Sequence, residues 1–179
     1  MVASIGPKNV ELTAELADGW QPIHFVPDRF QQVWGESLEA GRARRSADLG
    51  PLENMAGGPV ALGSGAHVAE AREEARAHIA FYVGGMGAKS KNFYNDLFKR
   101  YGWVEEAETI QELFLSGKRA EATAAVPDEY LDLSMLCGDE GYVRGRLQVY
   151  KEVGVTHPNI EPKGENPLEV IEKIKAWSE

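Results

Sequence analysis

The chain has 179 residues, of which 43% are hydrophobic and 26% charged, a composition typical of one soluble globular domain with a hydrophobic core. Its formal net charge of −9 argues against a nucleic-acid-binding protein, which needs a basic surface to neutralise phosphates. The sequence holds no run of about 20 apolar residues for a membrane-spanning helix, and its first residues lack the pattern of a signal peptide, so no membrane partner is expected.

Apolar segments alternate with helical patterns along the chain. In chain order, the predicted elements up to residue 83 are a strand end at 1–5, a helix from Pro7 to about 17, a strand at 20–25, a helix from Pro27 to about 41, a strand at 55–62 and a long helix at 67–83. Beyond residue 83, the sequence predicts helices at 92–101 and 104–115, a helical turn at 128–133, a helix from Gly138-Asp139 to about 153, a strand at 155–161 and a helix that begins after Asn166. Apolar residues recur at three- and four-residue steps in the helices. Pro158 is expected to weaken the last strand.

This alternation predicts an α/β domain with a parallel sheet covered by helices. About four strand–helix units occur, and the segment at about 84–135 predicts a helical insertion within a single domain of residues 1–179. A complete (β/α)8 barrel takes about 250 residues and eight units, whereas an open doubly wound sheet closes with fewer strands. The pattern alone leaves both architectures open.

Residue types that carry redox or metal chemistry are sparse. Cys137 lies in an apolar setting with no second cysteine, so we expect a small buried side chain and a reducing, cytoplasmic compartment. The four histidines show no metal-ligand spacing, and no protein-bound metal is expected. No paired carboxylates or nucleophile–base pattern stands out, and the four tryptophans are expected to pack in the core.

Seven short segments carry a resemblance to a known family. They are residues 3–9 (ASIGPKN), 15–20 (ELADGW), 56–61 (AGGPVA), 82–87 (YVGGMG), 91–95 (KNFYN), 141–144 (GYVR) and 151–156 (KEVGVT). Together they resemble the luciferase-like oxidoreductases that use coenzyme F420, an actinobacterial type related to methylene-tetrahydromethanopterin reductases. The resemblance extends over essentially the whole chain.

The resemblance implies the C-terminal half of a (β/α)8 TIM barrel, because the family places four further strands upstream of the matching region. It also implies hydride transfer between a deazaflavin and an unknown small organic substrate. Flavin mononucleotide (FMN) is the alternative cofactor, since flavin-dependent monooxygenases share the superfamily. A second alternative is an inactive half-barrel that forms a homo-oligomer or pairs with a missing half, because an open half-barrel exposes strand edges and apolar surface.

The first strand-to-helix turn is the leading cofactor-site candidate. Ser4, Gly6, Pro7 and Lys8 lie at the carboxyl end of a predicted parallel strand, where barrels and open sheets bind ligands. No acidic residue precedes Glu11, so the helix N–H groups remain available to an anion. In the family this turn helps to hold the phosphate-bearing tail of the cofactor. An ordinary turn is the alternative interpretation.

Three further positions are weaker candidates. Gly57 and Gly58 are expected either to let the backbone approach the cofactor or to form a bulge at a barrel corner, and the bulge is the simpler interpretation. The glycines at 84–87 predict a flexible break that hinges a lid or a plain helix end. Lys163 follows the last strand and is expected either to contact phosphate or to be solvated.

Overall fold

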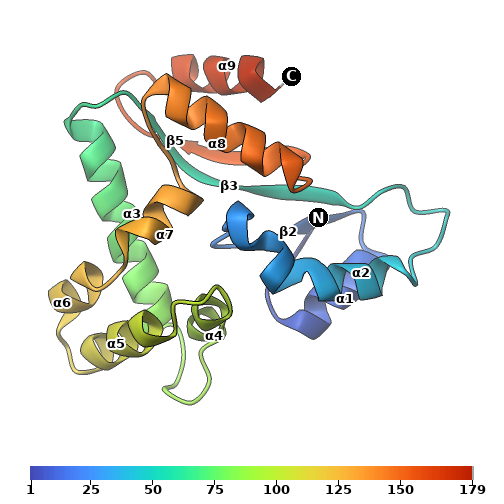
Figure 1. Ribbon diagram of the computed structural model, residues 1–179, viewed down its shortest axis with the longest axis horizontal. Helices are drawn as coiled ribbons and strands as arrows, with labels where there is room; N and C mark the ends of the chain where they lie inside the picture. The colour runs from blue at the N-terminus through green and yellow to red at the C-terminus, as the bar shows by residue number, and fades with distance from the viewer. Residues whose placement is uncertain (179) are drawn as a thin grey trace.

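The chain folds as a parallel sheet surrounded by helices in a computed structural model that describes residues 1–178 (Figure 1). The strands are β1 (Val2–Ala3), β2 (Gly19–Gln21), β3 (Glu53–Leu62), β4 (Leu136–Gly138) and β5 (His157–Pro162). The helices are α1 (Pro7–Leu16), α2 (Glu36–Arg42), α3 (Ala66–Gly85), α4 (Phe93–Arg100), α5 (Val104–Leu115), α6 (Arg119–Ala124), α7 (Asp128–Ser134), α8 (Glu140–Glu152) and α9 (Pro167–Ser178), and the turns η1 (Pro27–Arg29) and η2 (Gln31–Gly35) precede α2.

The long strand β3 organises the sheet. All strand pairings are parallel, and β1, β2, β3 and β5 neighbour one another in chain order, with Val2 opposite Trp20 and residues 55–60 opposite 157–162. Consecutive strands in a (β/α)8 barrel follow this order. The predicted α/β architecture with about four strand–helix units is therefore confirmed. Pro158 does not prevent β5 from forming, and it lies opposite Ala56.

The strand β4 is absent from the sequence-based prediction. It pairs with the carboxyl end of β3 on the edge opposite β5, because Val60 lies beside both Leu136 and Pro162. Three residues are too few to give a readable period. Cys137 at its centre is buried, as predicted, and burial raises the pKa of its thiol to about 11, so the thiol stays protonated near neutral pH.

The helical segment between α3 and β4 contains α4, α5, α6 and α7. Gly84 and Gly85 are the last two residues of α3, so the segment forms the plain helix end that is one of the two interpretations of the sequence, and not a flexible break at these two residues. A Cβ atom on Gly84 or Gly85 would come within 2.5 Å or 2.4 Å of the Phe114 side chain on α5. These glycines therefore let two helices pack closely.

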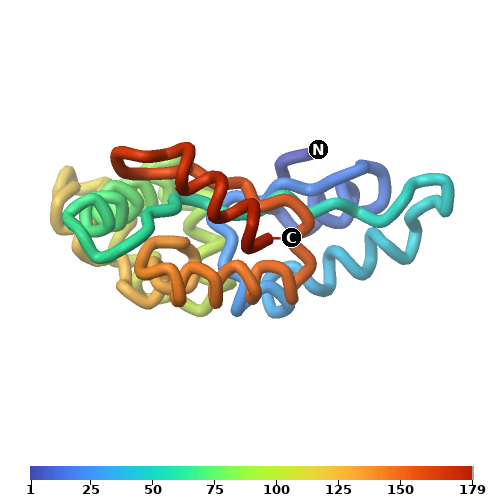
Figure 2. The backbone as a smooth tube through the Cα atoms, turned by 90° about the horizontal axis from the view of Figure 1, so that it is seen from above, coloured from blue at the N-terminus to red at the C-terminus, as the bar shows by residue number. Residues whose placement is uncertain are grey.

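Aromatic side chains fill much of the core. Trp20 and Trp34 are fully buried and meet edge-on, with ring centroids 5.2 Å apart. Trp103 is buried as well, which confirms the expected packing role for these three residues. Seen from above, the molecule is long and thin, with α1 and α2 towards one end and α3 to α6 towards the other (Figure 2). Within residues 1–178, no helix is both long and apolar enough to cross a bilayer.

Candidate functional site

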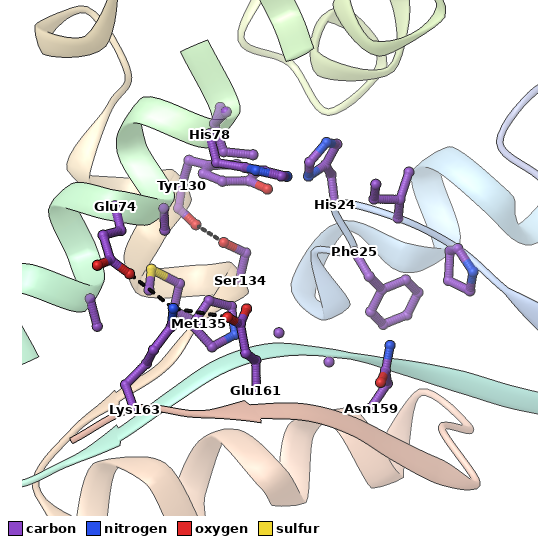
Figure 3. A pocket seen from close by; sticks show the side chains of 18 of the residues that line it. His24, Phe25, Glu74, His78, Tyr130, Ser134, Met135, Asn159, Glu161 and Lys163 are labelled. Atoms are coloured by element: carbon purple, nitrogen blue, oxygen red, sulfur yellow. Dashed lines mark hydrogen bonds and ion pairs between the residues drawn. The ribbon is translucent and has the colours of Figure 1, made fainter. Parts of the chain in front are cut away.

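A cavity of about 540 Å³ opens above the β3–β5 part of the sheet (Figure 3). Residues of β3 and β5 form one side, and the segment after β2 together with α3 and α7 forms the others. Its apolar lining includes Pro22, Ile23, Phe25, Pro59, Ile79 and Met135. A concave, mostly apolar site of this size with a few polar groups is the usual form of a small-molecule site.

Gly57 and Gly58 line this cavity for different physical reasons. A Cβ atom on Gly57 would lie 2.2 Å from the backbone oxygen of Asn159, so the close approach of β3 and β5 requires a glycine there. A Cβ atom on Gly58 would meet only the Ser134 oxygen, at 3.8 Å. The register of β3 against β5 runs without interruption from 55 to 60, so no bulge separates these two strands.

His24 follows β2 with an unusual backbone conformation, since its φ of +54° lies in the left-handed region. The strand itself does not continue to Phe25 as the sequence pattern predicts but stops at Gln21, directly before Pro22, which has no backbone N–H to donate to a neighbouring strand. Non-glycine residues adopt the left-handed region at a cost in free energy, and such positions cluster at functional sites. His24 lines the cavity.

The His24 ring lies among three other rings. Tyr82 and His78 from α3 and Tyr94 from α4 meet it edge-on, with centroid distances of 4.9, 5.7 and 5.8 Å. The residue is partly exposed, but its Nε2 atom is buried and has no hydrogen-bond partner within residues 1–178. Burial, helped by the nearby His78, lowers the pKa of His24 to about 3, so its imidazole is neutral near pH 7.

The charged groups of the cavity form one small network. Lys163 Nζ donates to Glu74 and to Glu161, both at 2.9 Å (Figure 3). Hydrogen bonds to Glu161 and Glu74 raise the pKa of Lys163, so its ammonium stays charged. Lys163 therefore pairs with two carboxylates in this structure. It is neither a lone solvated lysine nor an unpaired cation that is available to a phosphate. Together the three residues carry a formal charge of −1.

The predicted turn at β1 lies outside the cavity lining. Ser4 is buried, and its Oγ lies 2.9 Å from Thr13 Oγ1, so this hydroxyl serves the packing of α1. Gly6 precedes α1 and Pro7 begins it, and a Cβ atom on Gly6 would meet nothing within 4 Å. The Lys8 side chain is 92% exposed and pairs with Glu11 at 3.3 Å.

The predicted site residues thus fall into two places. Gly57 and Gly58 are in the cavity, whereas Ser4, Gly6, Pro7 and Lys8 form the neighbouring turn, which reaches the cavity through Ala3. Sequence reasoning missed His24, because a lone histidine between a short strand and Pro27 carries no recognisable pattern. The charge network around Lys163 was missed because Glu74 comes from α3, whereas Glu161 lies in β5 and Lys163 directly follows that strand.

Metal-ligand residue types are dispersed over the part of the chain that the structure describes. Among residues 1–178, no three His, Cys, Asp or Glu side chains come together in a way that could hold a metal ion.

Two known proteins are similar to the chain in sequence. It is 36% identical over 158 residues to a Mycobacterium tuberculosis protein described as a coenzyme F420-dependent oxidoreductase, with 87% of this chain and 45% of that protein covered. It is 26% identical over 160 residues to the 5,10-methylenetetrahydromethanopterin reductase of Archaeoglobus fulgidus, with the same coverage. The chain thus spans about half the length of the curated relatives it matches.

Solved structures support the same fold. The coenzyme F420-dependent tetrahydromethanopterin reductase from Methanopyrus kandleri matches 98% of this chain with 47% of its own, at a TM-score of 0.62 and 22% identity. An F420-dependent secondary alcohol dehydrogenase matches 99% of this chain with 48% of its own, at a TM-score of 0.61 and 12% identity. Residues 1–157 match the model of the family described as luciferase-like monooxygenase. The chain belongs to the luciferase-like monooxygenase family.

Proposed function

We propose that this chain forms the cofactor-holding half of an F420-dependent oxidoreductase that transfers hydride to or from a small organic substrate. The observation that carries the proposal is the cavity at Gly57 and Gly58, in a chain 36% identical to a protein described as an F420-dependent oxidoreductase. A deazaflavin supplies the hydride chemistry itself, so the protein needs chiefly to bind and orient it. The absence of a nucleophile–base pattern in the sequence fits this division of labour.

Two parts of the site fit the two parts of such a cofactor. Gly58 leaves the sheet face open to a flat ring, because a Cβ atom there would meet no atom closer than 3.8 Å. The turn before α1 suits an anionic tail, because the first turn holds no acid, no side chain caps it, and the space at Gly6 is open. Lys8, which is exposed and, among residues 1–178, pairs only with Glu11, adds a positive charge at this turn.

F420 is favoured over FMN as the cofactor. The Mycobacterium tuberculosis relative and both structural neighbours are described as F420-dependent. The cofactor is tested by titrating the full chain with oxidised F420 and, separately, with FMN, while following cofactor fluorescence. We expect saturable binding of F420 and at least tenfold weaker binding of FMN, a difference of about 1.4 kcal/mol. Equal binding, or binding of FMN alone, would contradict the F420 assignment.

We also propose that the chain functions in an assembly, as a homo-oligomer or with a complementary half-barrel, in the cytoplasm. Within the described chain, β1 lies at the edge of the sheet and pairs only with β2, and Met1 and Val2 are 48% and 44% exposed. Unpaired strand edges are templates for association. A free, buried cysteine fits a reducing compartment. Light scattering that shows only monomers across a wide concentration range would contradict the homo-oligomer.

A further inference from the structure

The two outer strands of the sheet differ in how they meet a further strand. Within the described chain, β1 pairs only with β2 and β5 pairs only with β3, so each has one free edge. An unpaired strand edge presents backbone N–H and C=O groups to which another strand can bind. The residues at each edge decide whether it is open to such pairing.

Two prolines close the free edge of β5. The backbone N–H of Lys163 donates to the oxygen of Val60, which lies in β3. Backbone groups of successive strand residues point to opposite sides, so positions 158, 160 and 162 direct theirs to the free edge. Pro158 and Pro162 have no N–H, and an added strand would find only that of Ile160. Proline on an edge strand opposes pairing with another chain.

The edge at β1 is open and has an apolar helix surface beside it. β1 contains no proline, and Val2 in it is 44% exposed. The helix α1 packs on this end of the sheet and buries Val10 and Ala14 fully. Its Leu12 and Leu16 are 53% and 62% exposed and are neighbours one helical turn apart. An exposed apolar patch beside an open strand edge is typical of a protein interface.

The leucine flank of α1, formed by Leu12 and Leu16, is turned away from α2 and carries no acidic side chain. Glu11 and Glu15 are the two acids of α1, and both pair with Arg44, just after α2, at 2.7 and 2.8 Å. Each leucine follows one of these glutamates, and successive helical residues are about 100° apart, so the leucines face another direction. Two identical copies can therefore share this flank without acid–acid repulsion, although the chain has a formal net charge of −9.

We infer that the β1–α1 end of the chain, formed by β1 and the leucine flank, docks against the same end of a second copy about a two-fold axis. This inference rests on the proposed assembly and names its contact surface. A two-fold axis at the sheet edge makes the two β1 strands antiparallel and places the two α1 helices side by side on one face. Lys8, at the start of α1, then lies towards the carboxyl end of the partner's α1, where a cation is favoured.

The difference between the two edges selects this two-fold contact. A head-to-tail contact joins β1 of one copy to β5 of the next, and a complementary half-barrel pairs with both edges. Both arrangements require the β5 edge, which its prolines close. A contact of β1 with β1 uses the open edge alone, and it stops at two copies because each copy has one such edge. The two edges lie at opposite ends of the sheet, with α1 and α2 at one end and α9 at the other (Figure 1).

The test applies a thiol-specific bismaleimide crosslinker to two full-chain variants, Leu12→Cys and Leu168→Cys. Cys137 does not interfere, because it is the one cysteine of the chain and burial raises the pKa of its thiol. We expect Leu12→Cys to give crosslinked dimers, and Leu168→Cys, at a position 75% exposed on α9, to run as a monomer on denaturing gels. In an equal mixture of the two variants, Leu12→Cys chains should crosslink only to each other. Crosslinks between the two variants would show a head-to-tail contact and overturn the inference.

A second pair of variants measures the contribution of the leucine flank. Leu16→Glu places a carboxylate on this flank in both copies, so we expect the dimer dissociation constant to rise on the order of tenfold or more. Leu168→Glu is the matched control at another exposed helix position and should leave the constant unchanged. Sedimentation velocity at matched concentrations measures both, and far-UV circular dichroism checks the fold. An equal rise in both variants overturns the assignment to α1.

The outcomes separate this inference from the proposed function. Dimers that form without Leu12→Cys crosslinks overturn the contact surface and leave the homo-oligomer standing. A chain that is monomeric at all concentrations overturns both the surface and the homo-oligomer. The F420 titration is independent of these results, since crosslinked dimers that bind no F420 keep the surface and contradict the oxidoreductase proposal.

Discussion

Gly57 and Gly58 are neighbours in β3 that face different surroundings, which makes them a matched pair for mutation. We expect Gly57→Ala to lower the free energy of unfolding by about 2 kcal/mol, because its new methyl group meets the Asn159 backbone at 2.2 Å. Gly58→Ala should change the free energy of unfolding by less than about 0.5 kcal/mol and weaken F420 binding. Urea unfolding of both variants measures the difference. Equal destabilisation would contradict the separate roles of the two glycines.

His24 also predicts how stability depends on pH. Its pKa is about 3 in the folded chain and about 6.5 when unfolded, so the unfolded state takes up a proton first as the pH falls. Above pH 6.5 both states are neutral at His24, so this residue adds no pH dependence there. Below pH 6.5 the free energy of unfolding falls, by at most about 1.4 kcal/mol per pH unit. His78, whose pKa burial also lowers, adds to the same trend, while nearby Glu161 opposes it.

His24→Asn should flatten this dependence between pH 6.5 and 5, above the range where carboxylates protonate. Thermal unfolding followed at several pH values measures it. A slope unchanged by the substitution would show that His24 is not neutral in the folded chain.

At the scale of elements, one ion pair joins segments that lie far apart in the sequence. Asp28 in η1 accepts two hydrogen bonds from Arg146 on α8, at 3.1 and 2.5 Å, and Arg146 is 8% exposed. Burial alone would raise the pKa of Asp28. The pKa is nevertheless lowered, because Arg146 stabilises the carboxylate. This pair fixes the segment that follows His24 against α8.

Asp28→Asn should therefore lower the free energy of unfolding by about 1 to 2 kcal/mol, since it leaves a buried guanidinium without its counter-ion. Lys8→Ala is the control, because it removes only an exposed pair and should cost less than about 0.5 kcal/mol. Chemical unfolding at pH 7 compares the two. Similar losses would show that the Asp28–Arg146 pair is no more than a surface contact.

The elements that the sequence predicts well are those with strong local signals. The helix predicted at 104–115 coincides with α5, and Asn92 caps α4 by accepting hydrogen bonds from the backbone of Tyr94 and Asn95. The two errors have different causes. β4 is a strand because it pairs with β3, and its three residues leave no periodic pattern in the sequence. β2 ends at Gln21 because Pro22 follows it without a backbone N–H, which the apolar pattern at 20–25 does not register.

At the scale of the whole molecule, the free edge of β1 predicts self-association. Val2→Lys places a charge on this edge, and edge lysines oppose strand pairing between chains. We expect the variant to shift the chain towards monomer, as measured by light scattering at matched concentrations. Leu168→Lys is the control, since Leu168 is 75% exposed on α9, a helix that packs against α8, β3 and β5. An equal shift in both variants would place the contact elsewhere.

The sequence located the candidate site only in part. The turn at Gly6 and the glycines of β3 were found through short segments that resemble a family. His24 and the network around Lys163 depend on how α3, α4 and β5 meet, and such contacts cannot be read from local spacing. The cavity is thus a property of the fold, whereas the turn is a property of the local sequence.

The most direct test of the account is to map F420 onto the ¹⁵N-labelled chain through backbone amide shifts. The account predicts saturable shifts at Gly57 and Gly58 and at the turn from Gly6 to Lys8. Gly117 and Gly145 should be unaffected, because neither lines the cavity or belongs to this turn. Absence of shifts, or shifts confined to residues outside the cavity and the turn, would contradict it.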